Sequence, residues 1–141
     1  MRFEKEKDIE RENKAIEAFL KPFNGTFDKL GCNDIDFKIY DSKNKLLGFV
    51  EVKGRLRNMA NAFPLPISVK KLIKLIDKKI NPIVVWACYD GIIFAEVKDL
   101  KGELRIGGRK PRNGSSNDIE LMAYFENEFN GIKNKIKFIK Y

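Results

Sequence analysis

The sequence lacks histidine entirely and contains two cysteines among its 141 residues. Without imidazole, serine–histidine hydrolases, histidine-ligated zinc enzymes and histidine-based ribonucleases lose their usual proton carrier or metal ligand. Cys32 and Cys88 stand far apart and without a second pair, which favours neither a disulfide framework nor a cysteine-ligated zinc site. Any catalysis therefore has to use aspartate, glutamate, lysine or a hydroxyl group, and a reducing compartment is expected.

A long apolar run is also absent. No stretch approaches the roughly 18 apolar residues that a membrane-spanning helix needs. The N-terminal sequence MRFEKEKDIERENK carries many charges with no apolar segment behind them, which is unlike a secretion signal. We therefore expect a soluble protein that stays in the cytoplasm.

Positive charge, in contrast, is abundant. Lysine and arginine total 28 against 20 acidic residues, and the formal net charge of +8 favours a polyanionic partner such as nucleic acid. Hydrophobic residues make up 43% of the chain and include 11 phenylalanines, which is enough for the core of one domain. We expect that single domain to span 1–141, with its core at about 9–100, a basic glycine-rich loop at 104–118 and a C-terminal extension at 119–141.

Apolar periodicity predicts the order of helices and strands. Helical spacing of apolar residues indicates helices, and alternation or short apolar runs between turn residues indicate strands. The predicted elements are a helix over 9–23, a hairpin of strands 34–40 and 46–53, a loop at 54–66, a helix capped by Ser68, and strands 83–89 and 92–97. This α-β-β-α-β-β order predicts a single-domain α/β (α+β) fold with a mixed sheet flanked by helices.

The strand at 46–53 brings an acid and a base together. Residues two apart in a strand share one face at about 7 Å, so Glu51 and Lys53 lie together while Val50 and Val52 face the other way. We expect the face with Glu51 and Lys53 to be the one turned away from the core. This placement makes the pair available for chemistry.

The hairpin adds a second carboxylate beside Glu51. Pairing Asp36 with Glu51 leaves 42–45 as the connecting loop, whereas pairing Asp34 with Glu51 leaves 41–44, and both loops are acceptable. Two carboxylates at this spacing repel each other unless a cation lies between them. An all-oxygen site of this kind suits Mg²⁺ or Mn²⁺, which would polarise a phosphodiester and activate a bound water.

An Asp that opens one strand, followed by Glu-X-Lys on the next, resembles the signature of the PD-(D/E)XK nuclease superfamily. Here the pattern is Asp36 with Glu51-Val52-Lys53, and the predicted elements follow the family's order over roughly residues 9–100. The proline of the family name is absent, since Ile35 precedes Asp36. Without a separate DNA-reading domain, the chain looks most like the compact Holliday-junction-resolvase branch.

The resemblance implies a Mg²⁺-dependent DNA endonuclease, with Mn²⁺ able to substitute, that acts on branched or structured DNA in recombination or repair. Asp36, Glu51 and the main chain of Val52 would be metal ligands, and Lys53 would stabilise charge or orient water. Resolvases of this type are homodimers because two strands must be cut symmetrically. The implied partners are therefore DNA and a second copy of the chain.

A glutamate on the first helix precedes the motif in that branch of the family. Positions 12, 16, 19 and 23 share one helical face, so Glu12 points towards the apolar side, where an acid needs a partner or a metal. Glu12 is therefore expected to assist the metal or the water. Glu10, two residues earlier and on a more solvated side, is the alternative.

Basic residues around the motif are candidate contacts to the DNA backbone. They follow the Glu-X-Lys strand, open the second helix or lie on the glycine-rich loop: Arg55, Arg57, Lys70, Lys71, Arg109, Lys110 and Arg112. Trp86, Tyr89 and Phe94 are interpreted as core residues of their strands rather than as platforms for stacked bases.

Two other hypotheses fit the same residues. One is a restriction-type, repair-type or exonucleolytic enzyme of a mobile element, built on the same fold. The other is a non-catalytic DNA-binding module, which would bind without metal and with a steep dependence on salt. Intact motif positions at Asp36, Glu51 and Lys53 favour an enzyme.

Overall fold

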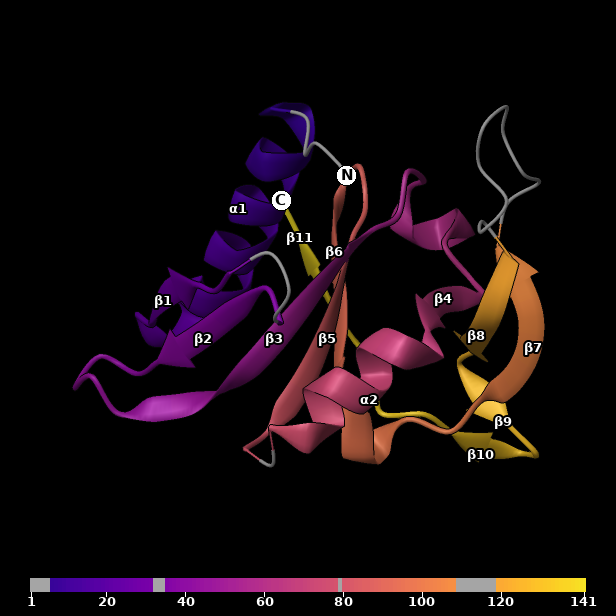
Figure 1. Ribbon diagram of the computed structural model, residues 1–141. Helices are drawn as coiled ribbons and strands as arrows, with labels where there is room; N and C mark the ends of the chain where they lie inside the picture. The colour runs from indigo at the N-terminus through magenta and orange to yellow at the C-terminus, as the bar shows by residue number, and fades with distance from the viewer. Residues whose placement is uncertain (1–5, 32–34, 79, 109–118) are drawn as a thin grey trace.

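The computed structural model describes residues 6–31, 35–78, 80–108 and 119–141. Its helices are α1 (Glu6–Leu20) and α2 (Val69–Asp77), with short 3-10 turns η1 (Lys21–Phe23), η2 (Met59–Asn61) and η3 (Val97–Asp99). Its strands are β1 (Thr26–Lys29), β2 (Phe37–Tyr40), β3 (Leu46–Gly54), β4 (Leu65–Ser68), β5 (Pro82–Ala87), β6 (Gly91–Glu96), β7 (Glu103–Gly108), β8 (Ile119–Phe125), β9 (Glu128–Phe129), β10 (Ile132–Lys133) and β11 (Lys137–Lys140). Figure 1 shows a sheet with a helix on each side, which confirms the predicted α+β class.

The main sheet has six strands in the order β1-β2-β3-β5-β6-β11. β3 and β5 run parallel, and the other neighbours pair antiparallel, so the sheet is mixed as predicted. The sequence pattern did not reveal β1 and β11, the two edge strands. Their side chains are mostly exposed, so they lack the apolar alternation by which strands are recognised.

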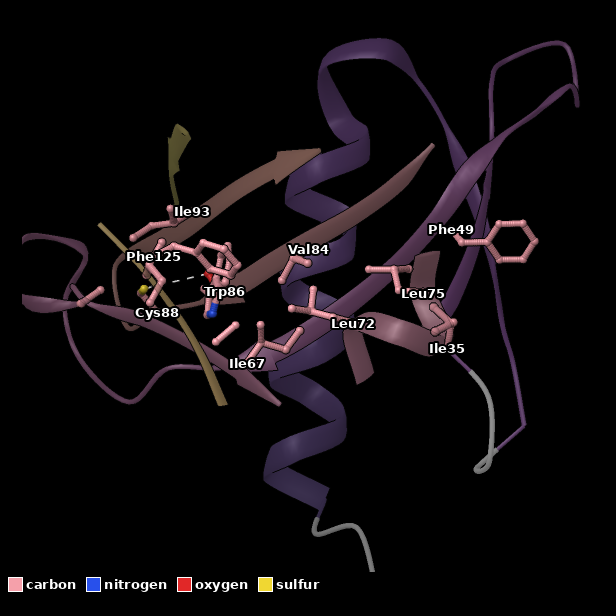
Figure 2. Packing of buried hydrophobic residues seen from close by; sticks show 13 residues of the cluster. Ile35, Phe49, Ile67, Leu72, Leu75, Val84, Trp86, Cys88, Ile93 and Phe125 are labelled. Carbon is pink, nitrogen blue, oxygen red and sulfur yellow. Dashed lines mark hydrogen bonds between the residues drawn. The ribbon is translucent and has the colours of Figure 1, made fainter. Parts of the chain in front are cut away.

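Helix α1 covers one face of this sheet and α2 covers the other. On the α1 side, Ile16 and Phe19 pack with Val50 and Val52 of β3. On the α2 side, Leu72, Leu75, Phe49, Val84 and Trp86 belong to the second apolar cluster (Figure 2). Central strands of the sheet are consequently covered on both faces.

Helix α1 begins and ends earlier than the apolar pattern indicated. The prediction was 9–23, whereas α1 runs from Glu6 to Leu20 and continues as a 3-10 turn that contains Pro22. Acidic residues in the first turn, Glu6 and Asp8, complement the helix dipole without contributing to the apolar stripe. The early start adds a polar turn, which contains Asp8, to the N-terminal end of α1.

Helix α2 begins as predicted. The Ser68 hydroxyl accepts a hydrogen bond from the Lys71 backbone N–H at 3.2 Å, which confirms Ser68 as the N-cap. The cap fixes the first turn of α2 directly after β4. The side chain of Lys71 therefore projects from α2 at a defined position beside the main sheet.

Part of the expected loop at 54–66 forms a strand. β4 pairs antiparallel with β8, and β8 pairs with β7, giving a separate three-stranded sheet. The indole N–H of Trp86 donates to the Pro66 carbonyl at 2.8 Å and ties this sheet to the main one. Residues 104–108 of the expected glycine-rich loop are also strand, while 109–118 lie outside the described residues.

Among the helices described, none is long and apolar enough to cross a membrane.

Candidate active site

The two motif carboxylates come together where β2 ends and β3 continues. Phe37 pairs with Val50, so the register extends to place Asp36 opposite Glu51. Because β2 begins at Phe37, the Val52 N–H has no strand residue opposite it, and it donates instead to Asp36 Oδ2 at 2.8 Å. A shift in register at Tyr40 lengthens the connection to 41–45, one residue more than predicted for this pairing. Asp34 lies outside the described residues.

Glu51 is buried, which corrects the expected solvated face. Its exposed fraction is 2%, close to the values for Val50 and Val52 on the opposite face. The expectation was wrong because it treated β3 as a strand with one wet face, whereas a central strand beside a parallel partner is covered on both. The carboxyl of Glu51 therefore sits under α2, at the border of the apolar cluster.

Lys71 forms an ion pair with this buried carboxyl. Its Nζ lies 3.1 Å from Glu51 Oε2, while the rest of the half-exposed side chain extends from the first turn of α2. The pKa of Glu51 is raised to about 8, chiefly by burial and then by the charge of Asp36 beside it, whereas Lys71 lowers it. Burial and Asp36 thus favour the protonated form of Glu51, and the ion pair with Lys71 opposes them.

Lys71 had been expected to contact the DNA backbone from the helix surface. The structure instead brings it to Glu51 of the Glu-X-Lys motif, and helical geometry explains why. Lys71 lies four residues before the buried Leu75 and three after the Ser68 cap, so it stands at the edge of the buried face. That spacing is the signal in the sequence that could have found it.

A pocket of about 190 Å³ lies at the end of β3 and beside α1. Its lining residues come from α1, from the β3 end and its continuation, and from α2 and β5: Asp8, Arg11, Glu12, Val52, Lys53, Gly54, Leu56, Lys71 and Ala87. Figure 1 shows the N-terminal half of α1 near the ends of β3 and β5. The pocket therefore unites both lysines with Glu12.

The two helix glutamates differ in position. Glu12 lines the pocket, is partly buried, and has its Oε2 3.5 Å from Lys29 Nζ. Glu10 is exposed and is not among the lining residues. Asp8 and Arg11, on the same side of α1, form an ion pair at 3.0 Å at the pocket wall. The geometry thus favours Glu12 over Glu10 as a group that can reach a bound molecule.

The arginines after β3 have different surroundings. Arg55 is partly buried and donates to the carbonyls of Ala62 at 2.8 Å and Pro64 at 3.3 Å, so it braces the following loop. Burial lowers its pKa, and the neighbouring Arg57 lowers it further. Arg57 is exposed, with a long hydrogen bond to Asn61 O at 3.4 Å.

Other predicted DNA contacts fall into two groups. Lys70 is exposed on α2 and remains available to a phosphate. Arg109, Lys110 and Arg112 lie outside the described residues.

The three aromatic residues assigned to the core differ in how far they are buried. Trp86 is fully buried, and Phe94 packs edge-on against Phe19 with ring centroids 4.9 Å apart. Tyr89 is 63% exposed, so its assignment to the core was wrong. Strand β5 ends at Ala87, and Tyr89 lies in the turn between β5 and β6, where the alternation of the strand no longer applies.

The donor set at Asp36 and Glu51 suits a hard divalent cation. Within the described part of the chain, no group of three or more His, Cys, Asp or Glu residues could hold a metal ion. Mg²⁺ commonly takes one or two carboxylates and completes its shell with water and substrate phosphate. Asp36 and Glu51 fit this pattern, because a cation between them would offset the repulsion that helps to raise the pKa of Glu51.

Comparison with known proteins gives one match. A search of curated proteins and a search of solved structures each found none. A family model with the description "Phage putative PDDEXK endonuclease" matches residues 1–132, a span that includes Asp36, Glu51 and Lys53. Because this match covers far more than half of the chain, the protein belongs to this family of PD-(D/E)XK endonucleases.

Proposed function

We propose that the protein is a single-domain DNA endonuclease that hydrolyses phosphodiester bonds with Mg²⁺, or Mn²⁺ in its place, held by Asp36 and Glu51. The observation that carries the proposal is the pairing of these carboxylates, which contact two residues that line the pocket: Glu51 pairs with Lys71, and Asp36 accepts from the Val52 N–H. When bound, the cation would polarise the phosphodiester and lower the pKa of a coordinated water.

The chain's own groups have distinct tasks in this proposal. Asp36 is oriented by the Val52 N–H, which fixes one carboxylate oxygen and leaves the other for the cation. The main-chain carbonyl of Val52 is the third candidate ligand. Glu51 is held between Asp36 and Lys71, so its carboxyl is positioned before a cation arrives. Such preorganisation keeps the reorganisation cost of the reaction low.

The two lysines supply fixed positive charge. Lys53 and Lys71 both line the pocket, from β3 and α2 respectively. A fixed cation at a phosphoryl centre stabilises the negative charge that develops on the oxygens. Lys53 would act directly on the phosphate or the attacking water, and Glu12 would hold that water from the α1 side.

Branched or structured DNA is the substrate we favour. The net charge of +8 and the exposed Arg57 and Lys70 suit a polyanion, and the resemblance to resolvases adds the expectation of a homodimer with two cuts. The cytoplasm is the compartment we propose. A sequence-specific or exonucleolytic enzyme of a mobile element is the second candidate, because the description of the matching family names phages.

Cleavage of a panel of labelled DNAs tests the proposal. Wild type, Glu51→Ala, Lys53→Ala and the exposed control Glu10→Ala are compared on a four-way junction, a flap, linear duplex and single strand, with Mg²⁺, Mn²⁺ or EDTA. We expect metal-dependent products from wild type and the control, and loss of cleavage in the two motif variants. Symmetric nicks would identify a resolvase, ladders from an end an exonuclease, and fixed fragments a sequence-specific enzyme. Binding in EDTA without any cleavage would overturn the catalytic proposal in favour of a DNA-binding module.

A further inference from the structure

An exposed aliphatic side chain lines the pocket, and an exposed aromatic one lies two residues beyond the lining residue Ala87. Tyr89 is 63% exposed and Leu56 is 55% exposed, and the exposed Arg57 lies next to Leu56 in the chain. We call these three residues the rim. Large apolar side chains in contact with water usually need no explanation singly, but an aromatic beside a nucleic-acid-cleaving pocket is a candidate contact for a base.

Hydrogen bonds hold the rim in place. The Arg55 N–H donates to Ala87 O at 2.9 Å and the Tyr89 N–H donates to Arg57 O at 3.0 Å, so the pairing of β3 with β5 continues past the end of both strands. The next residue, Asp90, accepts from the Met59 N–H at 2.8 Å. A backbone fixed in this way makes binding less costly, because little conformational entropy is lost when a ligand contacts Tyr89.

The rim is close to the catalytic residues. Leu56 and Ala87 both line the pocket, and Tyr89 lies two residues beyond Ala87, so its Cα is at most about 7 Å from that of Ala87. Successive nucleotides in one strand of a duplex are separated by about 3.4 Å along the axis. A phosphate in the pocket would therefore bring a base one or two nucleotides away to the level of Tyr89.

The chemistry of the rim suits an unstacked nucleobase. An aromatic ring offers a stacking surface to any base, and a guanidinium beside it can contact the adjoining phosphate. A base inside an intact duplex is already stacked on both sides and presents no free face. The rim would thus recognise DNA in which a base near the cut has lost a neighbour.

We propose that Tyr89 stacks on an unpaired nucleobase one or two nucleotides from the scissile phosphate, so that the enzyme selects branched, flapped or single-stranded DNA over continuous duplex. This inference rests on the proposed nuclease function and specifies its substrate class. Leu56 packs beside the same base, and Arg57 contacts the backbone. The hydroxyl group of Tyr89 has no part in the stacking.

Kinetic comparison of variants tests the stacking. Tyr89→Phe keeps the ring, whereas Tyr89→Leu keeps a large apolar side chain without it. With cation saturating, Tyr89→Leu is expected to raise KM for flapped or single-stranded DNA by roughly 5- to 100-fold, the range measured for loss of one base–aromatic stack. Tyr89→Phe should remain within about twofold of wild type. Ile132→Ala, on the β9–β10 hairpin with 58% exposure, is the matched control and should behave as wild type.

A photocrosslink in EDTA supplies a second readout that does not require cleavage. 5-Iodouracil is placed at successive positions of a flapped DNA, and the crosslinked residue is identified by mass spectrometry. We expect Tyr89 to be labelled from one or two positions beside the branch and not from continuous duplex. Equal KM values for wild type and Tyr89→Leu, or equal losses for the Phe and Leu variants, would overturn the inference. Crosslinking at Tyr89 by a chain that cleaves no DNA would leave the stacking intact and overturn the proposed function instead.

Discussion

Lys71 Nζ lies 3.1 Å from Glu51 Oε2, so a lysine on α2 is the counter-ion of a carboxyl on β3 that is 2% exposed. This contact links α2 to the strand that carries the Glu-X-Lys motif. It also places a positive charge where a cation and a substrate phosphate would have to arrive. The contact predicts that Lys71 is required for function although it lies outside the Glu-X-Lys motif.

Lys71→Ala is therefore expected to lower the rate of cleavage by about 100-fold, the loss typical of one fixed charge-stabilising group. Because Lys71 lowers the pKa of Glu51, the variant should also need a higher pH to reach half of its maximal rate. The measurement is a pH–rate profile at saturating DNA. Lys74→Ala, which removes the same charge from another exposed position of α2, is the control; it should leave the rate within about twofold of wild type and the pH of the half-maximal rate unchanged. Equal effects of the two substitutions would show that Lys71 acts only as general surface charge.

Binding of the cation is expected to release a proton. The pKa of Glu51 is raised to about 8, so below that pH a divalent cation must displace a proton to be bound. Affinity for Mn²⁺ should fall as the pH decreases from about 8, and titration calorimetry in buffers of different ionisation enthalpy measures the protons released. Asp36→Asn removes the charge that helps to raise this pKa, so any remaining binding should release fewer protons at about pH 7. A pH-independent affinity in wild type would contradict the assignment of Glu51 as a ligand.

Glu51 should also make the stability of the cation-free protein depend on pH. Its pKa in the folded protein lies above that of the unfolded chain, so the folded state binds the proton more tightly. The corresponding stabilisation is present below about pH 4.5 and is lost as the pH rises through about 8. Glu51→Gln cannot ionise, and its Tm should exceed that of wild type at about pH 9 by more than at about pH 5. A difference in Tm that is the same at both pH values would argue against a raised pKa.

Glu12 and Glu10 offer a matched pair on α1. Glu12 lines the pocket and Glu10 does not, although the two side chains have the same chemistry. Glu12→Gln is expected to lower kcat by roughly 10- to 100-fold, because a group that holds the attacking water has been neutralised. Glu10→Gln should change kcat by less than about twofold. Similar kcat values for both variants would remove Glu12 from the proposed site.

Local patterns in the sequence were enough to predict much of the central fold. Alternation in the hairpin predicted an Asp beside Glu51 in either of two registers, the family resemblance favoured Asp36, and the pairing of Phe37 with Val50 places Asp36 opposite Glu51. Ser68 could be recognised as a cap because capping depends on the nearest turn of the helix. These features depend on interactions between residues that are close in sequence, which a local sequence pattern can indicate.

Features that depend on distant segments could not be predicted in the same way. β3 pairs in parallel with β5 across α2, and this arrangement buries Glu51 on a face that alternation alone had suggested was solvated. The contact of Lys71 with Glu51 needs the position of α2 over the sheet. Tyr89 was assigned to the core because it continues an apolar run, yet the chain turns at that residue. Each error arose where tertiary packing overrides a local pattern.

The proposed hydrolysis depends most directly on the Asp36–Glu51 pair as a cation site. Single-turnover cleavage of one branched DNA in a Mg²⁺ titration tests this, with Glu51→Gln and Asp36→Asn compared with wild type and Glu10→Gln. We predict cleavage that rises to saturation with Mg²⁺ in wild type and Glu10→Gln, and none in the two motif variants at any concentration. Mg²⁺-dependent cleavage by Glu51→Gln at the wild-type rate would contradict the account.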